Sequence, residues 1–292
     1  MALVLVWGGV LGGLGYALIT HLPTLRSHAA AKGSADPTAI AIRFEETPSW
    51  MPKSTLRQLA NAAHQAMASA SPLEVEALQR VHQEFLASGW FTHIEQVRRT
   101  ASNEILVSGA FRTPVAMVRS EGEDHLIDEQ GRRLPLAYSG TGARPRLPLI
   151  LGVALPKPAE SGAIWLGADL RAALNLTALL RQRVWFANGQ VQAIDTSRFA
   201  HEGIVELVTD RSTRIVWGGD PNDRSLSEMP ADRKLAALDA MYQVSKRVDN
   251  GGDRTIDIRF DVVTLAPSSP SSDASTEAPT DESPARLTAS VP

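Results

Sequence analysis

Apolar positions in the first half of the chain follow a helical spacing and then a strand spacing. Side chains at intervals of three and four predict two amphipathic helices, the first over Ser54–Ala68. The second begins at a capping box, Ser71–Glu74, and ends at Ser88-Gly89, where glycine accepts a left-handed cap. Alternating apolar residues precede and follow this pair. Strand, helix, helix and then strands predict a small two-layer α+β module.

The second half of the chain mixes the same two patterns, without an internal repeat. Two further amphipathic helices are predicted over Leu166–Arg183 and Ala231–Arg247. The whole body is therefore expected to belong to the α+β class. The strands predicted along the chain are Ile40–Phe44, Ile94–Arg99, Glu104–Phe111, Val115–Ser120, His125–Asp128, Arg132–Leu136, Val191–Asp195, Gly203–Leu207, Arg214–Trp217 and Thr255–Phe260.

Ala2–Ile19 contains eighteen residues without a charged side chain. A helix of this length covers about 27 Å, enough for the core of a bilayer. We expect a single transmembrane anchor at 1–20 and a linker at 21–38, with a cleaved signal peptide or a buried core helix as alternatives. Because Arg26 and Lys32 follow the span and nothing basic precedes it, the positive-inside rule alone would leave the body in the cytoplasm.

Composition narrows the class of protein. Hydrophobic residues make up 43% and charged residues 21% of 292, as in an ordinary globular chain. The net charge of −3 resides in residues 267–292, an acidic Ser/Pro/Thr-rich stretch that is predicted to be a disordered tail. The neutral body has three tyrosines and argues against a nucleic-acid partner. The absence of cysteine excludes disulfides, thiol nucleophiles and cysteine-ligated zinc.

No catalytic or metal-binding motif stands out. The seven histidines form no close ligand pair, and neither a phosphate-binding loop nor a nucleophile elbow occurs. We therefore expect no cofactor, no metal and no catalysis. Asp128 and Asp195 are the candidates for an acid/base pair, although Asp128 also fits the cap of a turn. Trp50, Trp90, Trp165, Trp185 and Trp217 are each expected to pack in or against the core.

Several short motifs follow one another along the chain in a recognisable order. They are Trp90–Val97, Phe111–Ala116, Leu126–Gly131, Leu147–Gly152, Thr209–Gly218, Lys234-Leu235 and Ile256–Phe260. In these motifs and their order the chain resembles the FtsQ/DivIB family of bacterial cell-division proteins, over about residues 40–262. Phe111 stands where the family usually has an acid, and Ser212 or Thr213 stands where it has a hairpin glycine.

The resemblance implies a single-pass protein of the inner (cytoplasmic) membrane whose bulk is periplasmic. It implies a POTRA domain at 39–120, a β domain at 121–266 and a variable tail at 267–292. The implied function is that of a divisome scaffold in septum formation, which binds other proteins without catalysis. The implied partners are FtsB/FtsL-like coiled-coil division proteins and components of the septal synthase.

In the family, the far end of the β domain captures its partner by adding a strand to its sheet. A free sheet edge offers a row of N–H and C=O groups to such a strand. In this chain the candidate edge is Thr255–Phe260 with the following Asp261–Leu265, and an interior strand is the alternative. The expected partner-binding residues are Thr255, Ile256, Asp257, Ile258, Arg259, Phe260, Val262 and Val263.

Two other functions stay open at this point. An envelope hydrolase or carbohydrate-active enzyme would require Asp128 and Asp195 to converge on one pocket. A POTRA-containing secretion or assembly component would predict a repeated module or a barrel partner, and the sequence contains no such repeat.

Overall fold

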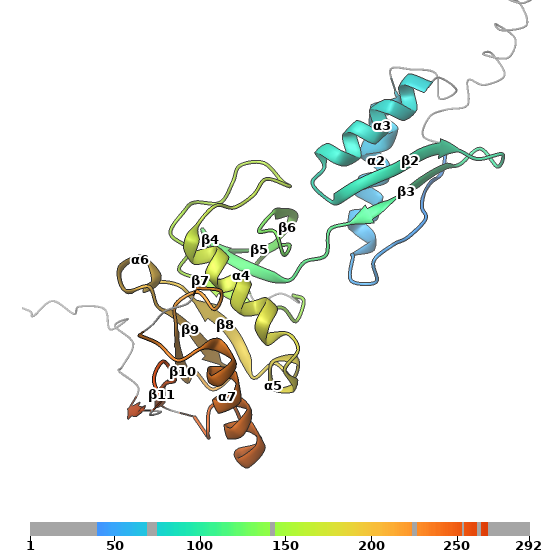
Figure 1. Cartoon of the computed structure of the whole chain (residues 1–292). Coiled ribbons are helices and arrows are strands. Elements are labelled where there is room, and N and C mark those ends of the chain that lie inside the picture. Colours follow the sequence, from blue (N-terminus) through green and yellow to red (C-terminus); the bar gives the residue numbers. More distant parts are fainter. Residues whose placement is uncertain are drawn as a thin grey trace, which may run out of the picture.

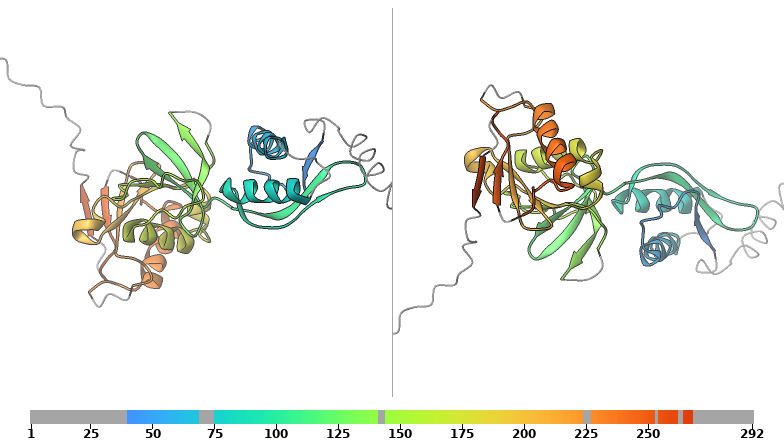
Figure 2. Two further views of the ribbon diagram at one scale, coloured as in Figure 1. Left: turned by 90° about the horizontal axis from the view of Figure 1, so that it is seen from above. Right: turned by 90° about the horizontal axis from the view of Figure 1, so that it is seen from below.

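The computed structural model describes residues 40–68, 75–140, 144–223, 227–252, 254–261 and 264–267. Two modules, each built on its own sheet, are joined by a short connection after β3 (Figures 1 and 2). Within these ranges no helix has the length and apolar character needed to cross a bilayer. The predicted anchor, the capping box Ser71–Glu74, Val262, Val263 and residues 268–292 of the tail lie outside the described residues.

The first module has a three-stranded sheet of order β1-β3-β2. Strand β1 runs parallel to β3, so the chain between them needs a crossover, which the two helices provide. This confirms the order of elements predicted for the first half. Its elements are β1 (Ile42–Phe44), α2 (Lys53–Met67), α3 (Val75–Ala87), β2 (Phe91–Arg99) and β3 (Ile105–Phe111).

The core of the first module forms where both helices face the sheet. Helix α2 buries every fourth residue from Thr55 to Met67, as its predicted periodicity requires. Four phenylalanine rings meet between α3 and the sheet, with neighbouring centroids 4.2 to 6.2 Å apart. They are Phe85 of α3 and Phe44, Phe91 and Phe111 of the strands.

The second module is a nine-stranded sheet of order β12-β11-β10-β9-β8-β7-β4-β5-β6. Helices α4 and α7 cover one face of it (Figure 1). The elements are β4 (Ala116–Ser120), β5 (Glu123–Ile127), β6 (Arg133–Ser139), β7 (Leu149–Leu151), α4 (Ala168–Leu180), α5 (Val184–Ala187), β8 (Val191–Asp195), α6 (Phe199–Glu202), β9 (Val205–Thr209), β10 (Arg214–Gly218), α7 (Ala231–Ser245), β11 (Arg254–Asp257) and β12 (Thr264–Pro267).

The tryptophans fill the two cores, as predicted. Trp165, Trp185 and Trp217 are buried among the apolar side chains between the helices and the second sheet. Trp90 is buried in the first module, and the partly buried Trp50 packs against it at 6.1 Å between ring centroids. Each ring therefore contributes apolar area to the core.

The boundary between the modules differs from the predicted one at residue 120. Strand β4 pairs with β5 and β7 and belongs to the second sheet, so the first module ends at Phe111. Hydrophobic alternation predicted β4 as a strand, but it contains no signal for the sheet that the strand joins. Strands β7 and β12 and the short helices α5 and α6 were not predicted.

The predicted edge strand Thr255–Phe260 is shorter than expected and lies inside the sheet. Strand β11 ends at Asp257, whose carboxylate accepts a hydrogen bond from the backbone N–H of Arg259 at 3.0 Å. It pairs with β10 on one side and with β12 on the other. The interior alternative is therefore correct for β11, and the edge of the sheet is β12.

The modules also touch through two glycines, Gly89 at the end of α3 and Gly162 in the loop before α4. Both have positive φ angles, +78° and +80°. A Cβ atom on Gly162 would lie 2.9 Å from the Cα atom of Gly89. Only glycine combines this backbone conformation with so close an approach.

Gly162→Ala is expected to lower the free energy of unfolding by about 2–3 kcal/mol, because it adds a clash to the cost of left-handed backbone. Gly122→Ala is the matched control, since Gly122 has φ +80° and no heavy atom within 4 Å of an added Cβ. That variant is expected to lose only about 1–2 kcal/mol. Equal losses in urea unfolding would show that the contact between the modules contributes nothing.

Candidate functional site

The candidate site is the edge of the second sheet formed by β11 and β12. The backbone N–H of Ile258 donates to the carbonyl of Val216 on β10 at 3.2 Å. Successive residues of a strand direct their backbone groups to opposite sides. Ile256 therefore also faces β10, whereas the backbone groups of Thr255 and Asp257 face β12.

This alternation fixes which backbone groups of β12 have no partner among the described residues. Ala266 pairs with Thr255 and Thr264 pairs with Asp257, so these two residues of β12 direct their backbone groups toward β11. Leu265 and Pro267 then direct theirs away from the sheet. Proline has no N–H. The outer side of β12 thus presents one donor, the N–H of Leu265, and the carbonyls of Leu265 and Pro267.

An exposed aromatic side chain lies in the connection between β11 and β12. Phe260 is 49% exposed, and the guanidinium of Arg259 lies 5.1 Å from the centre of its ring. The same guanidinium donates to Asp257 at 2.7 Å. Burial raises the pKa of Asp257, but the hydrogen bonds from Arg259 lower it by more, so this carboxylate stays charged at neutral pH. The ion pair orients Arg259 beside the phenyl ring.

The predicted partner-binding residues separate into three groups. Ile256 and Ile258 are buried in the core, while the backbones of Thr255 and Asp257 bond to β12. Arg259 and Phe260 lie in the connection between β11 and β12. The predicted partner-binding residues ended at Val263, although the candidate edge extended to Leu265 and so included Thr264 and Leu265 of β12.

Asp195 lies at the end of β8, separated from β11 by the two strands β9 and β10, in a network of charges. It stands opposite Glu206 across β8 and β9, and Arg214 donates to both carboxylates at 2.9 and 2.8 Å. Burial raises the pKa of Asp195, but hydrogen bonds from Ser197 and Arg214 lower it by more. Arg198 donates to Glu206 at 2.6 Å. The network neutralises two carboxylates that would otherwise repel each other.

Asp128 lies elsewhere, in the turn between β5 and β6. One oxygen accepts the backbone N–H groups of Gln130 and Arg132, which confirms the predicted turn cap. The other accepts a hydrogen bond from Arg112 at 2.9 Å. Asp128 lines a groove beside the connection between the modules. Asp195 lines neither this groove nor another one beside α4. These grooves do not bring the two carboxylates together.

His125 on β5 is buried, and neither ring nitrogen has a hydrogen-bond partner among the described residues. Burial lowers its pKa, and the positive charge of Lys157 lowers it further, while Glu123 at 3.7 Å opposes the shift. The folded state therefore binds this proton less readily than the unfolded state. The contribution of neutral His125 to the free energy of unfolding is complete above the pKa that this histidine has in the unfolded chain, about 6.5. This contribution is lost as the pH falls below that value.

We expect the free energy of unfolding of the wild-type protein to decrease between pH 7.5 and pH 5. His125→Phe is expected to show a smaller decrease, because the group that takes up a proton on unfolding is absent. Urea unfolding at several pH values measures both profiles. His201→Gln, at an exposed position, serves as the control and is expected to keep the wild-type profile. Parallel profiles for wild type and His125→Phe would contradict the prediction.

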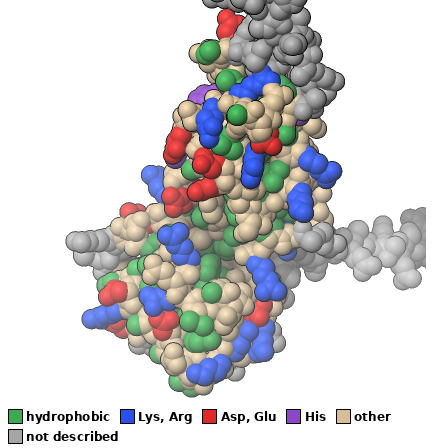
Figure 3. Space-filling view, turned by 90° about the vertical axis from the view of Figure 1, so that its right-hand side faces the viewer, with side chains coloured by type: hydrophobic (Ala, Val, Ile, Leu, Met, Phe, Trp, Pro, Cys, Tyr) green, Lys and Arg blue, Asp and Glu red, His purple; other side chains and the backbone are tan. Residues whose placement is uncertain are grey.

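Acidic and basic side chains are interspersed over the face shown in Figure 3. A comparison with models of known protein families gives no match for this chain, and a comparison with curated proteins also gives none.

Proposed function

We propose that this protein is a membrane-anchored divisome scaffold of the FtsQ/DivIB type, which binds division proteins by strand addition and catalyses no reaction. One observation carries the proposal. Among the described residues, the last strand along the chain, β12, is also the outermost strand of its sheet, and the ladder leaves the backbone groups of Leu265 directed outward. Such an edge is a template for an incoming strand.

Two further features support the proposal. The order β1-α2-α3-β2-β3 in the first module fits the POTRA-like domain that the resemblance implies. The exposed Phe260 beside the edge supplies an apolar anchor, and aromatic side chains are enriched among the residues that dominate binding. The occupants of the edge would be FtsB/FtsL-like coiled-coil proteins, and septal synthase components would bind elsewhere on the scaffold.

The proposed location is the inner membrane, with one span at 1–20 and the body in the periplasm. Reporters fused before Ala2 and after Pro292 test this topology, and a cytoplasmic body would contradict the division role. Fluorescent fusions in growing cells test the function itself. Enrichment at division sites is the expected result, and an even distribution around the cell would contradict the proposal.

A further inference from the structure

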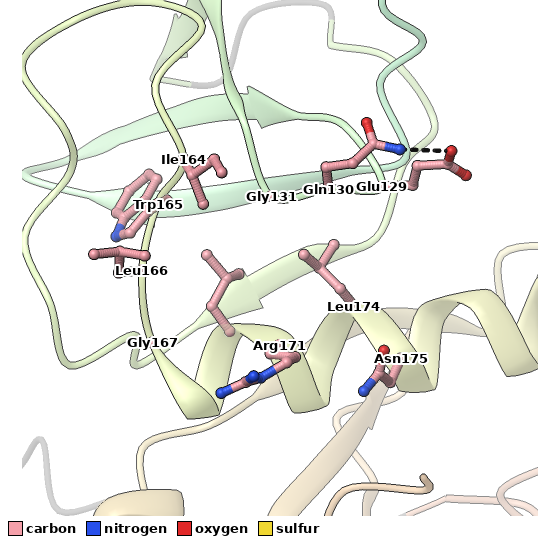
Figure 4. Close-up of a pocket in the computed structure, with 11 residues that line it drawn as sticks. Glu129, Gln130, Gly131, Ile164, Trp165, Leu166, Gly167, Arg171, Leu174 and Asn175 are labelled. Atoms are coloured by element: carbon pink, nitrogen blue, oxygen red, sulfur yellow. Dashed lines mark hydrogen bonds between the residues drawn. The ribbon is translucent and has the colours of Figure 1, made fainter.

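An apolar groove lies at the end of the second sheet opposite β12. It has a volume of about 370 Å³ and runs between the β5–β6 turn, residues 164–167 and the first half of α4 (Figure 4). Leu170 and Leu174 of α4 form its floor with Trp165. Figure 4 shows Leu174 pointing from the helix toward the turn at Gly131.

One wall of the groove carries unpaired backbone groups. Residues 163–165 pair with the chain that leads into β6: Arg133 donates to the carbonyl of Ala163 at 3.0 Å, and Trp165 donates to that of Gly131 at 2.8 Å. These two bonds flank an antiparallel bridge between Arg132 and Ile164. The N–H and C=O of Ile164 therefore point away from β6. They have no hydrogen-bond partner within the part of the chain that the structure describes.

The same wall exposes aliphatic side chains. Ile164 is 45% exposed and Leu166 is 68% exposed, and both line the groove. Leu155 is also exposed, and its carbonyl accepts the indole N–H of Trp165 at 2.9 Å. Exposed apolar side chains grouped around an apolar groove are typical of a binding surface.

The charges along the groove favour an acidic ligand. Arg171 on α4 lines it, is exposed, and makes no side-chain ion pair or hydrogen bond within the described ranges. The groove that Asp128 lines has a volume of about 270 Å³ and shares Glu129 and Gln130 with the first groove. It also includes Arg181, which is exposed and has no side-chain partner among the described residues. Asp128, which lines this second groove, is neutralised by Arg112. Among the residues that line the two grooves, these two arginines outnumber the one carboxylate without a cationic partner, Glu129.

We propose that this groove binds an extended segment of another protein, with aliphatic residues at alternate positions and acidic residues beside them. The segment pairs its backbone with Ile164 and places alternate side chains over Leu170 and Leu174. Its carboxylates meet Arg171 and Arg181. The site adjoins β6, at the end of the sheet opposite β12, and does not depend on the proposed division function.

The test uses the full-length chain in detergent and a phage-displayed library of random dodecapeptides as the probe. Selected peptides are expected to carry alternating aliphatic residues with Asp or Glu. Fluorescence anisotropy with the synthetic peptides then compares wild type with Leu166→Glu and Arg171→Glu. Each substitution is expected to weaken binding at least about tenfold. Val244→Glu, at an 87% exposed position on α7, is the matched control and is expected to leave binding unchanged.

Selected peptides that bind wild type, Leu166→Glu and Arg171→Glu equally would overturn the proposal, as would a selection without the expected pattern. A synthetic peptide of residues 281–292 tests another occupant, because this segment contains Glu282, Leu287 and Val291. If that peptide binds the groove more tightly than the selected ones, the groove serves the chain's own tail and the proposal of a partner protein is wrong. Circular dichroism of each variant verifies that it is folded.

Discussion

Leu265→Pro is expected to weaken the binding of the proposed FtsB/FtsL-like partner by roughly 5- to 150-fold while the second sheet stays folded. The N–H of Leu265 points away from β11, so its removal breaks no bond of the β11–β12 ladder. It does remove the one donor that these four residues offer to an incoming strand. The partner carbonyl that would have accepted this bond is then buried without a donor, which costs about 1–3 kcal/mol.

Two variants separate the loss of this donor from other effects. Leu265→Ala keeps the N–H and is expected to retain most of the affinity, because main-chain bonds carry the interaction. Ala266→Pro removes an N–H that bonds to Thr255, so it is expected to detach β12 from the sheet. Titration calorimetry with the partner measures the affinity of each variant. Equal affinities for Leu265→Pro and wild type would show that the partner does not pair with this edge.

Arg112→Met is expected to lower the free energy of unfolding by about 3–5 kcal/mol. Arg112 directly follows β3, the last strand of the first module. Its partner Asp128 lies in the second module, and the side chain of Asp128 is only 3% exposed. Removing the guanidinium leaves a buried carboxylate with backbone donors from Gln130 and Arg132 but without a counter-charge. Urea unfolding measures the loss, and hydrogen exchange at the connection between the modules shows where it acts.

Arg119→Met is a matched control for Arg112→Met. Its partner Asp124 is also buried, but a second arginine, Arg144, donates to that carboxylate at 2.6 Å. The remaining arginine keeps the charge compensated, so the expected loss is about 1 kcal/mol or less. Comparable losses in the two variants would contradict the claim that an unpaired buried charge at Asp128 causes the effect. Asp128→Asn combined with Arg112→Met should recover part of the stability, because it removes that charge.

Local patterns predicted the four long helices and most strands well. The spacing of apolar residues in 54–68 predicted α2 to within one residue at each end, because the buried stripe of a helix repeats within a single segment. Helix α4 begins at Ala168, two residues later than predicted. Its preceding Gly167 has φ +148°, where an L side chain is strained. Strand β7 has only three residues, too few to show a period.

The candidate site was only partly predictable. The alternation of Thr255–Phe260 correctly indicated that Ile256 and Ile258 face a core. Alternation reports the two faces of a strand, but an edge is a property of its two sides, which depend on neighbouring strands. Contacts between separate segments likewise produce the pair Arg112–Asp128 and the outward direction of the backbone groups of Ile164. Local sequence patterns do not report such contacts.

The sequence by itself determined the class of the body, the four long helices and the turn at Asp128, because side-chain spacing and turn chemistry act within a few residues. Tertiary structure alone decided that β4 joins the second sheet, that β11 is interior and that β12 is the edge. Strand pairing is a competition among distant segments for the same backbone hydrogen bonds, and its outcome depends on how the whole sheet packs against α4 and α7.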